Sequence, residues 1–368
     1  MNLFPELEKR YTRESMNARE AQRLAEFIAF GPVIFQTARI MLRLGIMDML
    51  RDSREGMTAA EVADKAGISL YAAKCLLEAS LCIGLILVDK DTDRFTISKT
   101  GWFLINDPAT RVNIDFNHDV NYLGWFNLEE ALLEGRPAGL KSLGDWTTVY
   151  EGLSSLPQHI RDSWFGFDHF YSDNSFDEAL RIVFDRKPAS LLDVGGNTGR
   201  WALRCVDHDK DVSVTILDLP QQIGLMLENI KGRDGAERID GIGVNLLDPD
   251  TRMPEGRRFD AVWMSQFLDC FSEDQIVSIL RRAAQVMDHD SRLYIMETLW
   301  DRQRFEPAAL CLTLTSLYFT AIANGNSKMY HSEDMARLVE EAGFEIETVH
   351  DFLGHGHSIL VCRLAGGQ

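Results

Sequence analysis

Residues 189–199 read ASLLDVGGNTG, and this stretch carries the most informative pattern in the chain. The apolar letters before Asp193 indicate a buried strand, and the letters WALRCV that follow Arg200 indicate a helix. A glycine-rich turn between a strand and a helix lets a ligand approach the backbone closely. The ligand also meets the free N–H groups at the helix N-terminus. The stretch therefore predicts a binding site for a nucleoside or a dinucleotide.

The register of this turn favours a cationic ligand. A dinucleotide-binding turn has glycines in the order G-x-G-x-x-G, but from Gly195 that register falls on Asn197 and Arg200. The sequence instead places Asp193 at the strand end, and Asn197 at a position where a positive φ angle is tolerated. Because a carboxylate at this point repels a pyrophosphate, we expect a ligand with an ammonium or sulfonium charge.

A second acidic residue ends the next predicted strand. The segment VTILDLP places Asp218 25 residues after Asp193, and a carboxylate there can accept hydrogen bonds from both ribose hydroxyls. Taken alone, either acidic residue is typical of a solvated loop end. Together, on consecutive strands, they predict S-adenosylmethionine (SAM), which joins adenosine to a cationic amino-acid tail.

From about residue 178 onward, short apolar segments alternate with helical ones. This rhythm predicts an α/β fold with a parallel sheet and helices on both faces. The predicted strands are ASLLDVGG, VSVTILDL, IDGIGVNLL, FDAVWMSQF, SRLYIMETLW, FEIETVH and HSILVCRL.

The first third of the chain is predicted to be helical and to contain a winged-helix outline. Thr58 and Ser69 are typical N-caps, for helices that end at Ala66 and near Gly84, and LILVDKDTDRFTIS follows as a hairpin. Residues 109–178 are rich in aromatic side chains, which form either a core or a flat apolar ligand pocket. We therefore expect a winged-helix domain at 1–108, a helical linker at 109–178 and a SAM-binding domain at 179–368.

The charge of the chain argues against nucleic acid as a partner. The 38 basic and 56 acidic residues give a net charge of −18, which repels phosphate backbones and anionic lipids. From Thr58 to Trp102 there are five basic and six acidic residues, so the winged helix lacks the positive charge of a DNA-binding module. We expect this module to pack or to dimerise, and the alternative is a winged-helix transcriptional regulator.

Several features indicate a cytoplasmic protein. Uninterrupted apolar stretches reach nine and ten residues, at 27–35 and 79–88, whereas a membrane span needs about 20. The start, MNLFPELEKR, lacks the basic and apolar regions of a signal peptide. The six cysteines form no C-x-x-C pair, and the H-x-H pair of His355 and His357 has no clear third ligand. We expect no membrane span, no disulfide framework and no metal site.

Several longer segments resemble the SAM-dependent O-methyltransferases that act on small molecules in plants and bacteria. The similar segments are LLDVGGNTG, LDLPQQI, GVNLLDPD, FLDCFSEDQIVSILRRAAQVM, IMETLW and EEAGFEIETVHDFLGHGHSILV. The resemblance covers nearly the whole chain. It implies a Rossmann-like, seven-stranded class I methyltransferase sheet with an antiparallel last strand, and a winged-helix domain that forms a homodimer. The implied cofactor is SAM, and the implied acceptor is a small aromatic or conjugated molecule.

The same resemblance implies a set of cofactor-binding residues. Gly195 faces the cofactor, Asp218 holds the ribose, and Asn245 with Leu246 borders the adenine. Asn245 replaces the family's usual aspartate, and Ser265 stands where the family usually has a lysine at the end of the fourth strand. The pattern of the two strand ends and the resemblance together give the complete predicted set, which is Asp193, Gly195, Gly196, Asn197, Gly199, Asp218, Leu219, Asn245, Leu246 and Ser265.

The catalytic segment departs from the family pattern. The family reads L-H-D-W-S-D-E, with the histidine as general base, whereas residues 268–274 read LDCFSED. Asp269 takes the place of the histidine, and a predicted capping box of Ser272 with Gln275 supports this register. Glu297 matches an acidic residue that orients the base in the family, whereas the second such position falls on Met329.

Four explanations of this departure remain open. A free aspartate, with a pKa of about 3.9, is a poor base for a phenol near 10, a gap of roughly 8 kcal/mol. Burial beside Glu297 would raise the pKa of Asp269 and make it a better base. Alternatively, positioning alone drives transfer to an acceptor that ionises by itself, or His331 supplies the base. The fourth explanation is a SAM-binding protein that has lost methyl transfer.

Overall fold

The computed structural model describes residues 2–248, 251–254 and 256–366. They form two compact units, one of residues 14–119 and one that joins residues up to 13 with residues 120–368. The predicted domain boundary, after residue 108, falls at the start of helix α8 (Pro108–Phe116). The observed division instead falls after residue 119. Residues 120–178 of the expected linker belong to the same unit as the C-terminal part, and Trp164 Nε1 donates to the Tyr318 hydroxyl at 2.8 Å within it.

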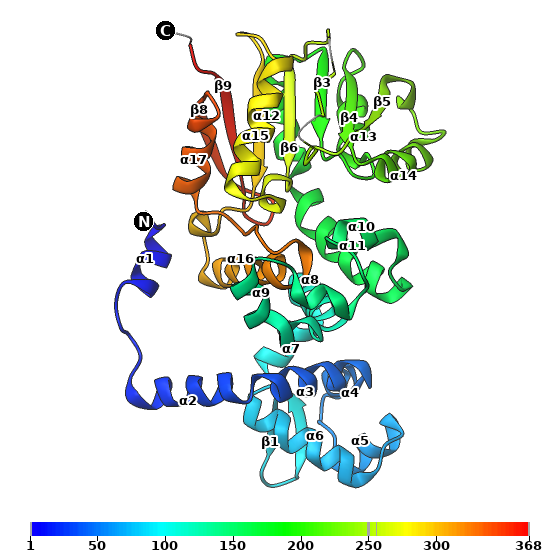
Figure 1. The fold of residues 1–368 in the computed structure, drawn as a ribbon. Coiled ribbons are helices and arrows are strands. Elements are labelled where there is room, and N and C mark those ends of the chain that lie inside the picture. Colours follow the sequence, from blue (N-terminus) through cyan, green and yellow to red (C-terminus); the bar gives the residue numbers. More distant parts are fainter. Residues whose placement is uncertain (1, 249–250, 255, 367–368) are drawn as a thin grey trace. The chain divides into compact units, whose positions relative to one another are not determined.

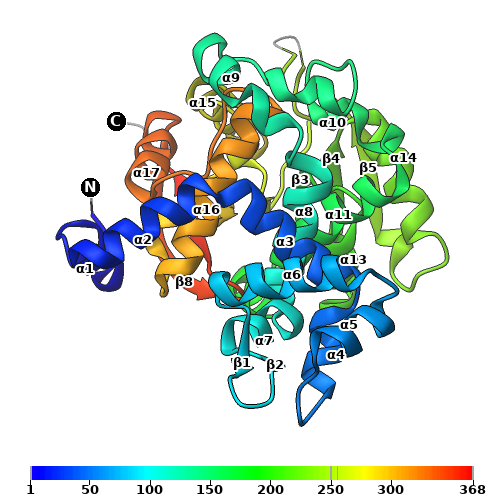
Figure 2. The ribbon, with the colours of Figure 1, turned by 90° about the horizontal axis from the view of Figure 1, so that it is seen from below.

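The unit of residues 14–119 has the predicted winged-helix outline (Figure 1). Thr58 caps α5 and forms a capping box with Glu61, and Ser69 caps α6. The hairpin strands β1 and β2 pair in antiparallel fashion. Helices α2 and α3 meet at an angle of 73° (Figure 2). The elements are α2 (Ala18–Ala29), α3 (Gly31–Arg43), α4 (Ile46–Asp52), α5 (Ala59–Ala66), α6 (Leu70–Ile83), β1 (Ile86–Asp89), β2 (Arg94–Ile97), α7 (Lys99–Asn106) and α8.

A seven-stranded sheet forms the centre of the other unit, and all seven predicted strands are present. The strand order is β5-β4-β3-β6-β7-β9-β8. β9 runs antiparallel to β7 and β8, and the remaining neighbours are parallel, which confirms the expected class I methyltransferase sheet. The strands are β3 (Ser190–Val194), β4 (Ser213–Asp218), β5 (Ile239–Gly243), β6 (Ala261–Ser265), β7 (Arg292–Glu297), β8 (Phe344–Leu353) and β9 (His357–Leu364).

Helices cover both faces of this sheet because its central strands are apolar on both sides. Ile279 and Leu338 belong to the core on one face, whereas Leu180, Cys205 and Met226 belong to the core on the other. The first face is covered by α15 (Glu273–Ala283) and α17 (Ser332–Glu341), and the second by α12 (Phe176–Val183), α13 (Arg200–His208) and α14 (Pro220–Ile230).

Helices and loops fill the aromatic-rich region, as predicted. Its longest helix is α11 (Gln158–Ser172), preceded by α9 (Leu128–Glu134) and α10 (Val149–Gly152). Apart from η11, which is described below, the short helices of the described residues are η1 (Asn117–Asn121), η2 (Gly124–Asn127), η3 (Ala138–Ser142), η4 (Leu153–Ser155), η5 (Asp173–Ser175), η6 (Phe184–Arg186), η7 (Ala236–Arg238), η8 (Leu268–Cys270), η9 (Ala284–Val286) and η10 (Trp300–Arg302).

Among the described residues, one helical segment has the length and composition of a membrane span. It comprises α16 (Glu306–Tyr318) and η11 (Phe319–Ala323), and two bent pairs, α2–α3 and α5–α6, also pass this test. A search for uninterrupted apolar runs misses the segment, since threonine and serine interrupt it. Leu312, Phe319 and Ile322 of the segment are nevertheless buried in the fold, and α1 (Pro5–Tyr11) packs against α16.

Candidate active site

The glycine-rich turn follows β3 where the strand order reverses, since β3 lies between β4 and β6. Ligands of open α/β sheets bind at this point, beyond the carboxyl ends of the strands. Gly195 and Asn197 have φ angles of 76° and 48°, so the positive φ expected of Asn197 is confirmed. A β-carbon on Gly195 would lie 2.3 Å from the Phe267 ring, and one on Gly196 would lie 2.6 Å from the Asp193 carboxylate. The turn therefore has no room for side chains at its first two positions.

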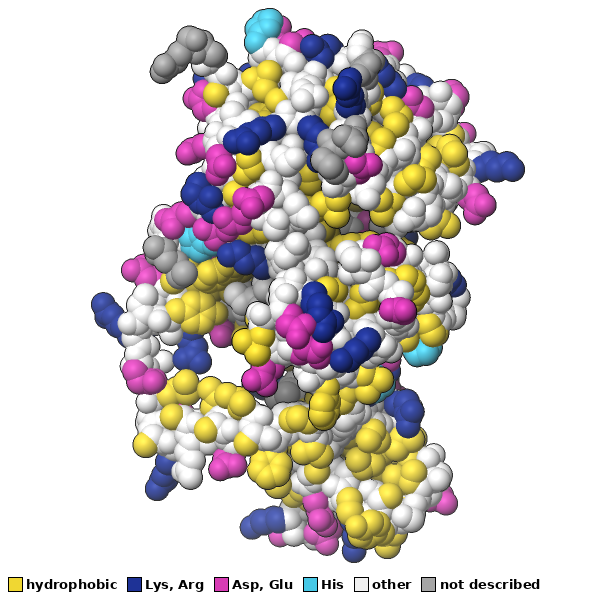
Figure 3. All heavy atoms as spheres, in the orientation of Figure 1, with side chains coloured by type: hydrophobic (Ala, Val, Ile, Leu, Met, Phe, Trp, Pro, Cys, Tyr) yellow, Lys and Arg dark blue, Asp and Glu magenta, His cyan; other side chains and the backbone are white. Residues whose placement is uncertain are grey.

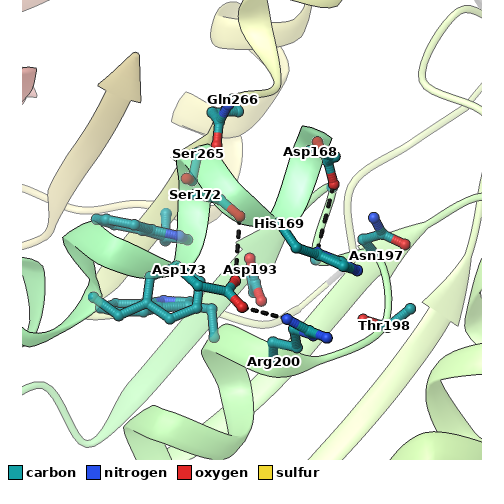
Figure 4. Close-up of a pocket in the computed structure, with 15 residues that line it drawn as sticks. Asp168, His169, Ser172, Asp173, Asp193, Asn197, Thr198, Arg200, Ser265 and Gln266 are labelled. Atoms are coloured by element: carbon teal, nitrogen blue, oxygen red, sulfur yellow. Dashed lines mark hydrogen bonds and ion pairs between the residues drawn. The ribbon is translucent and has the colours of Figure 1, made fainter. Parts of the chain in front are cut away.

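A pocket opens beside this turn (Figure 4). Its walls come from the end of α11, the turn after β3, the start of α13 and the end of β6. Five residues of the predicted cofactor set line it: Asp193, Gly195, Gly196, Asn197 and Ser265. The other lining residues are Asp168, His169, Ser172, Asp173, Phe176, Thr198, Arg200, Trp201, Trp263 and Gln266.

Three buried oxygen atoms at the pocket have no hydrogen-bond partner among the described residues: Oδ2 of Asp193, Oδ1 of Asn197 and Oε1 of Gln266. Buried acceptors are normally paired, so these three oxygens can accept from a ligand, and the buried Nε1 of Trp201, which also lines the pocket, has no partner among the described residues either. Asp193 is only 2% exposed, and burial, together with the Asp218 carboxylate, raises its pKa to about 8. A ligand with an ammonium group fits this site, because it brings both hydrogen-bond donors and the opposite charge.

Asp218 holds the turn from the neighbouring strand. Its Oδ2 accepts the Asn197 N–H at 2.8 Å, and its Oδ1 accepts the Leu219 N–H at 2.7 Å. Burial raises the pKa of Asp218, and these two hydrogen bonds partly oppose that effect. Each carboxylate oxygen has a further lone pair, so the group can also accept from a ligand.

The remaining members of the predicted cofactor set do not line the pocket. Oδ1 of Asn245 accepts the Leu247 N–H at 2.9 Å, and Leu246 is buried in the hydrophobic core. A β-carbon on Gly199 would lie 2.9 Å from the Met226 side chain. Gly199 therefore permits close packing of the turn against α14.

Asp269 and Glu297 form a buried carboxyl pair. Glu297, at the end of β7, accepts the N–H groups of Phe267 and Leu268 through Oε1, at 3.1 and 2.8 Å. These bonds fix the η8 turn, which carries Asp269, and the predicted capping box of α15 follows it. Burial raises the pKa of Asp269 to about 6. Burial and the Asp269 carboxylate raise the pKa of Glu297 well above its ordinary value.

Four neighbouring groups were not singled out from the sequence. The Cys270 thiol lies 3.4 Å from Oδ1 of Asp269. Burial raises the pKa values of Tyr150 and Tyr318, and nearby Cys270 adds to both shifts. Burial and the Asp269 carboxylate also raise the pKa of Asp168 to about 7. No local signal marks these residues, because they come from segments that lie far apart in the chain.

His331 does not fit the role of a base. Its Nδ1 accepts the Glu333 N–H at 3.1 Å as the cap of α17, and its Nε2 lies 3.2 Å from the Asn2 carbonyl oxygen, to which it donates. Both ring nitrogens are engaged, and the residue does not line the pocket. Met329, the second position where the family is acidic, accepts a hydrogen bond from Thr298.

His355 and His357 do not share one strand face. β9 begins only at His357, and Gly354 and Gly356, with φ angles of 51° and 112°, turn the chain before it. His357 is buried against the Ser175 hydroxyl, 2.9 Å from Nδ1, whereas His355 stacks on Phe170.

Comparison with known families identifies the chain. The profile of the Dimerisation2-like domain matches residues 22–95, and that of a methyltransferase domain matches residues 167–349. The two matches together cover more than half of the sequence. The chain belongs to the SAM-dependent O-methyltransferases with an N-terminal dimerisation domain. SAM is therefore the cofactor of this methyltransferase, and a small molecule is its acceptor.

Relatives of this methyltransferase act on varied acceptors, as their names state. Mitomycin biosynthesis 6-O-methyltransferase of Streptomyces lavendulae is 24% identical, with 84% of each chain covered. Phenazine-1-carboxylate N-methyltransferase of Pseudomonas aeruginosa is 22% identical, with 88% of this chain and 92% of the relative covered. The O-methyltransferase of neocarzinostatin biosynthesis, solved with SAM and 2-hydroxy-5-methyl naphthoic acid, shares the fold. Its TM-score is 0.66 at 18% identity, with 90% of this chain and 95% of that chain covered.

Proposed function

We propose that this methyltransferase methylates a hydroxyl oxygen of a small conjugated molecule and that Asp269 receives the hydroxyl proton. The observation that carries the proposal is the buried Asp269 carboxyl, only 4% exposed, in the position that the family gives to a histidine base. When bound, SAM supplies an electrophilic methyl group. The protein's part is to orient the acceptor and to hold its proton.

The surroundings of Asp269 make it a stronger base than a free aspartate. Its pKa of about 6, against about 3.9 in solution, narrows the gap to a phenol from about six units to about four. The higher pKa makes proton transfer from the phenol to Asp269 more favourable by about 3 kcal/mol. Because the charge of either carboxyl opposes ionisation of the other, Asp269 and Glu297 titrate as a coupled pair.

The proposed cofactor contacts follow from the unpaired acceptors at the turn. Asp193 and Asn197 receive the amino group of SAM, Asp218 accepts from the ribose, and Asn245 and Leu246 border the adenine. The glycines allow the cofactor to approach the backbone. The residues that complete the proposed site are Gly195, Gly196, Gly199, Leu219 and Ser265.

We also propose a homodimer formed through the unit of residues 14–119, as the matched Dimerisation2-like domain suggests. No residue of α2 is buried in this chain, which leaves its apolar side free for a second copy. A cytoplasmic location agrees with the six cysteines, all of which are free thiols.

Methyl transfer from labelled SAM to a panel of hydroxynaphthalenes, measured between pH 5 and 9, tests the role of Asp269. The wild-type rate should rise with pH through about 6, as the Asp269 carboxyl loses its proton. Asp269→Asn should lower kcat by about 10²–10⁴-fold and should abolish the rise of the rate with pH around 6. Asp274→Asn, an exposed aspartate in the same segment, is the matched control and should keep the wild-type profile.

Two other outcomes would favour rival explanations. An unchanged pH profile in Asp269→Asn means that positioning alone drives transfer to an acceptor that ionises by itself. Tight binding of SAM by calorimetry, with no methylated product from a broad panel, favours a relative that has lost methyl transfer. A winged-helix regulator would instead bind genomic DNA fragments with submicromolar affinity.

A further inference from the structure

We infer that the side-chain carbonyl of Gln266 binds the sulfonium group of SAM, and that this contact makes the site distinguish SAM from its neutral product, S-adenosylhomocysteine. Gln266 directly follows β6 and comes just before the η8 turn. It is not a member of the predicted cofactor set. The assignment rests on the proposed function in one respect, because the acceptor hydroxyl is placed beside Asp269.

The backbone of Gln266 is strained and firmly held. Its φ angle is 45°, a left-handed conformation that is uncommon for a glutamine. Its N–H donates to the Met296 carbonyl at 2.9 Å, and the N–H of Phe267 donates to Oε1 of Glu297 at 3.1 Å. Strain of this kind persists only where surrounding contacts enforce it, and it is concentrated at ligand sites. Hydrogen bonds to β7 thus hold Gln266 at the wall of the pocket.

The side-chain oxygen of Gln266 has no partner in the protein. Oε1 is buried and accepts no hydrogen bond from any described residue. A buried acceptor that stays unpaired costs free energy, so a ligand with a cationic group or a donor at this point is bound more tightly. Because the amide carries no net charge, its burial costs less than that of a carboxylate when the site is empty.

The place of Gln266 favours the sulfonium over the amino group as its partner. Figure 4 shows Gln266 at one end of the pocket, and Thr198 and Arg200 at the other end. Asp269 follows Gln266 by only three residues. Methyl transfer needs the acceptor oxygen and the methyl carbon in contact, so the sulfonium must lie at the end of the pocket that is nearer to Asp269. That end is the one that Gln266 lines.

No permanent cation of the protein occupies this end of the pocket. Among the described residues that line the pocket, Arg200 alone carries a permanent positive charge, and its guanidinium pairs with Asp173. In Figure 4 this ion pair lies well apart from Gln266. The Gln266 oxygen is therefore left for a positive charge that the ligand brings.

The contact depends on the charge of the bound cofactor. Transfer breaks the bond between sulfur and the methyl carbon and forms the bond between that carbon and the acceptor oxygen. The electron pair of the broken bond stays on sulfur, which becomes a neutral thioether, while Asp269 receives the hydroxyl proton. A contact to the starting charge does not accelerate this step. It favours SAM over S-adenosylhomocysteine, and so helps the exchange of product for new cofactor.

Two ligands that differ at the transfer position test the role of Gln266. In sinefungin a carbon with an amino group replaces the sulfur and its methyl group, whereas S-adenosylhomocysteine carries neither the methyl group nor a charge there. Calorimetry at pH 7 measures the binding of both to the full chain. We expect the wild type to bind sinefungin at least tenfold more tightly, since hydrogen bonds to charged groups are strong.

Gln266→Leu should reduce this preference at least fivefold and should change the affinity for S-adenosylhomocysteine less than threefold. Gln266→Glu should raise the preference at least threefold, because a carboxylate pairs with the added ammonium group. Gln285→Leu, the same change at an exposed glutamine of η9, is the matched control and should keep the preference of the wild type.

Three results would overturn the assignment of Gln266. They are equal binding of the two ligands by the wild type, an unchanged preference in Gln266→Leu or Gln266→Glu, and a loss in Gln266→Leu that is the same for both ligands. Failure of the proposed base is seen separately, in the pH profile of Asp269→Asn, because these binding measurements need no acceptor and no turnover.

Discussion

The Asp193 carboxyl lowers the stability of the cofactor-free protein as the pH rises. Its pKa is about 8 in the fold and about 3.9 in an unfolded chain. Between these values the unfolded state has released the proton while the folded state still holds it. The free energy of unfolding therefore falls with increasing pH. A cationic ligand removes this penalty, because it pairs with the carboxylate.

Replacing this residue should separate stability from binding. In Asp193→Asn, we expect a smaller loss of Tm between pH 6 and 9 without cofactor, since the titrating group is gone. At pH 8 the affinity for S-adenosylhomocysteine should fall at least tenfold, because the amide cannot balance an ammonium charge. Scanning fluorimetry and calorimetry measure the two effects. Asp207→Asn, an exposed aspartate of α13, should change neither, and unchanged affinity in Asp193→Asn would rule out the proposed cation contact.

At the scale of elements, the turn between β3 and α13 depends on glycine for two reasons. Gly195 has a φ angle of 76°, where a side chain adds strain. Its added β-carbon would also press on Phe267, which lies just before the η8 turn. A larger residue at 195 would thus disturb the cofactor turn and the segment that carries Asp269 together.

Two glycine variants test this dependence, because we expect them to change the free energy of unfolding in opposite directions. Gly195→Ala should lower the free energy of unfolding by about 1–3 kcal/mol and should weaken binding of S-adenosylhomocysteine at least tenfold. Gly224→Ala lies within α14, where a β-carbon meets nothing within 4 Å. It should raise the free energy of unfolding by about 0.5–1 kcal/mol and leave binding unchanged. Urea unfolding and calorimetry measure both, and equal stability of the two variants would contradict the role of the turn.

The sequence predicted those helices and strands whose formation depends on residues that are close together in the chain. Thr58 and Ser69 cap their helices because their hydroxyls reach N–H groups within the next turn, and the alternation of apolar runs is enough to predict all seven strands. The hydrogen bond between Trp164 and Tyr318 could not be predicted in this way, since the two residues lie far apart in the chain. The place of His331 just before a predicted helix made it a candidate base, and its hydrogen bond to the Asn2 carbonyl could not be predicted, because this bond joins distant parts of the chain.

On the scale of the whole molecule, the unit of residues 14–119 presents an apolar surface. Ile28, Phe30 and Val33, from the end of α2 and the start of α3, are 72%, 59% and 56% exposed. Figure 3 shows apolar side chains along α2. Large exposed apolar patches mark interaction sites, and the chain's net charge of −18 does not prevent association through a patch that carries little charge.

Ile28→Glu should therefore break the proposed homodimer. A carboxylate buried between two copies of α2 would have no partner, so we expect a dimer Kd at least 100-fold weaker than that of the wild type. Sedimentation velocity over a range of concentrations measures this change, and binding of S-adenosylhomocysteine by the monomer checks that the variant is folded. Glu26→Gln, an exposed position on the same helix, should leave the dimer intact. A wild type that remains monomeric at high micromolar concentration, or an Ile28→Glu variant that dimerises as tightly as the wild type, would exclude α2 as the interface.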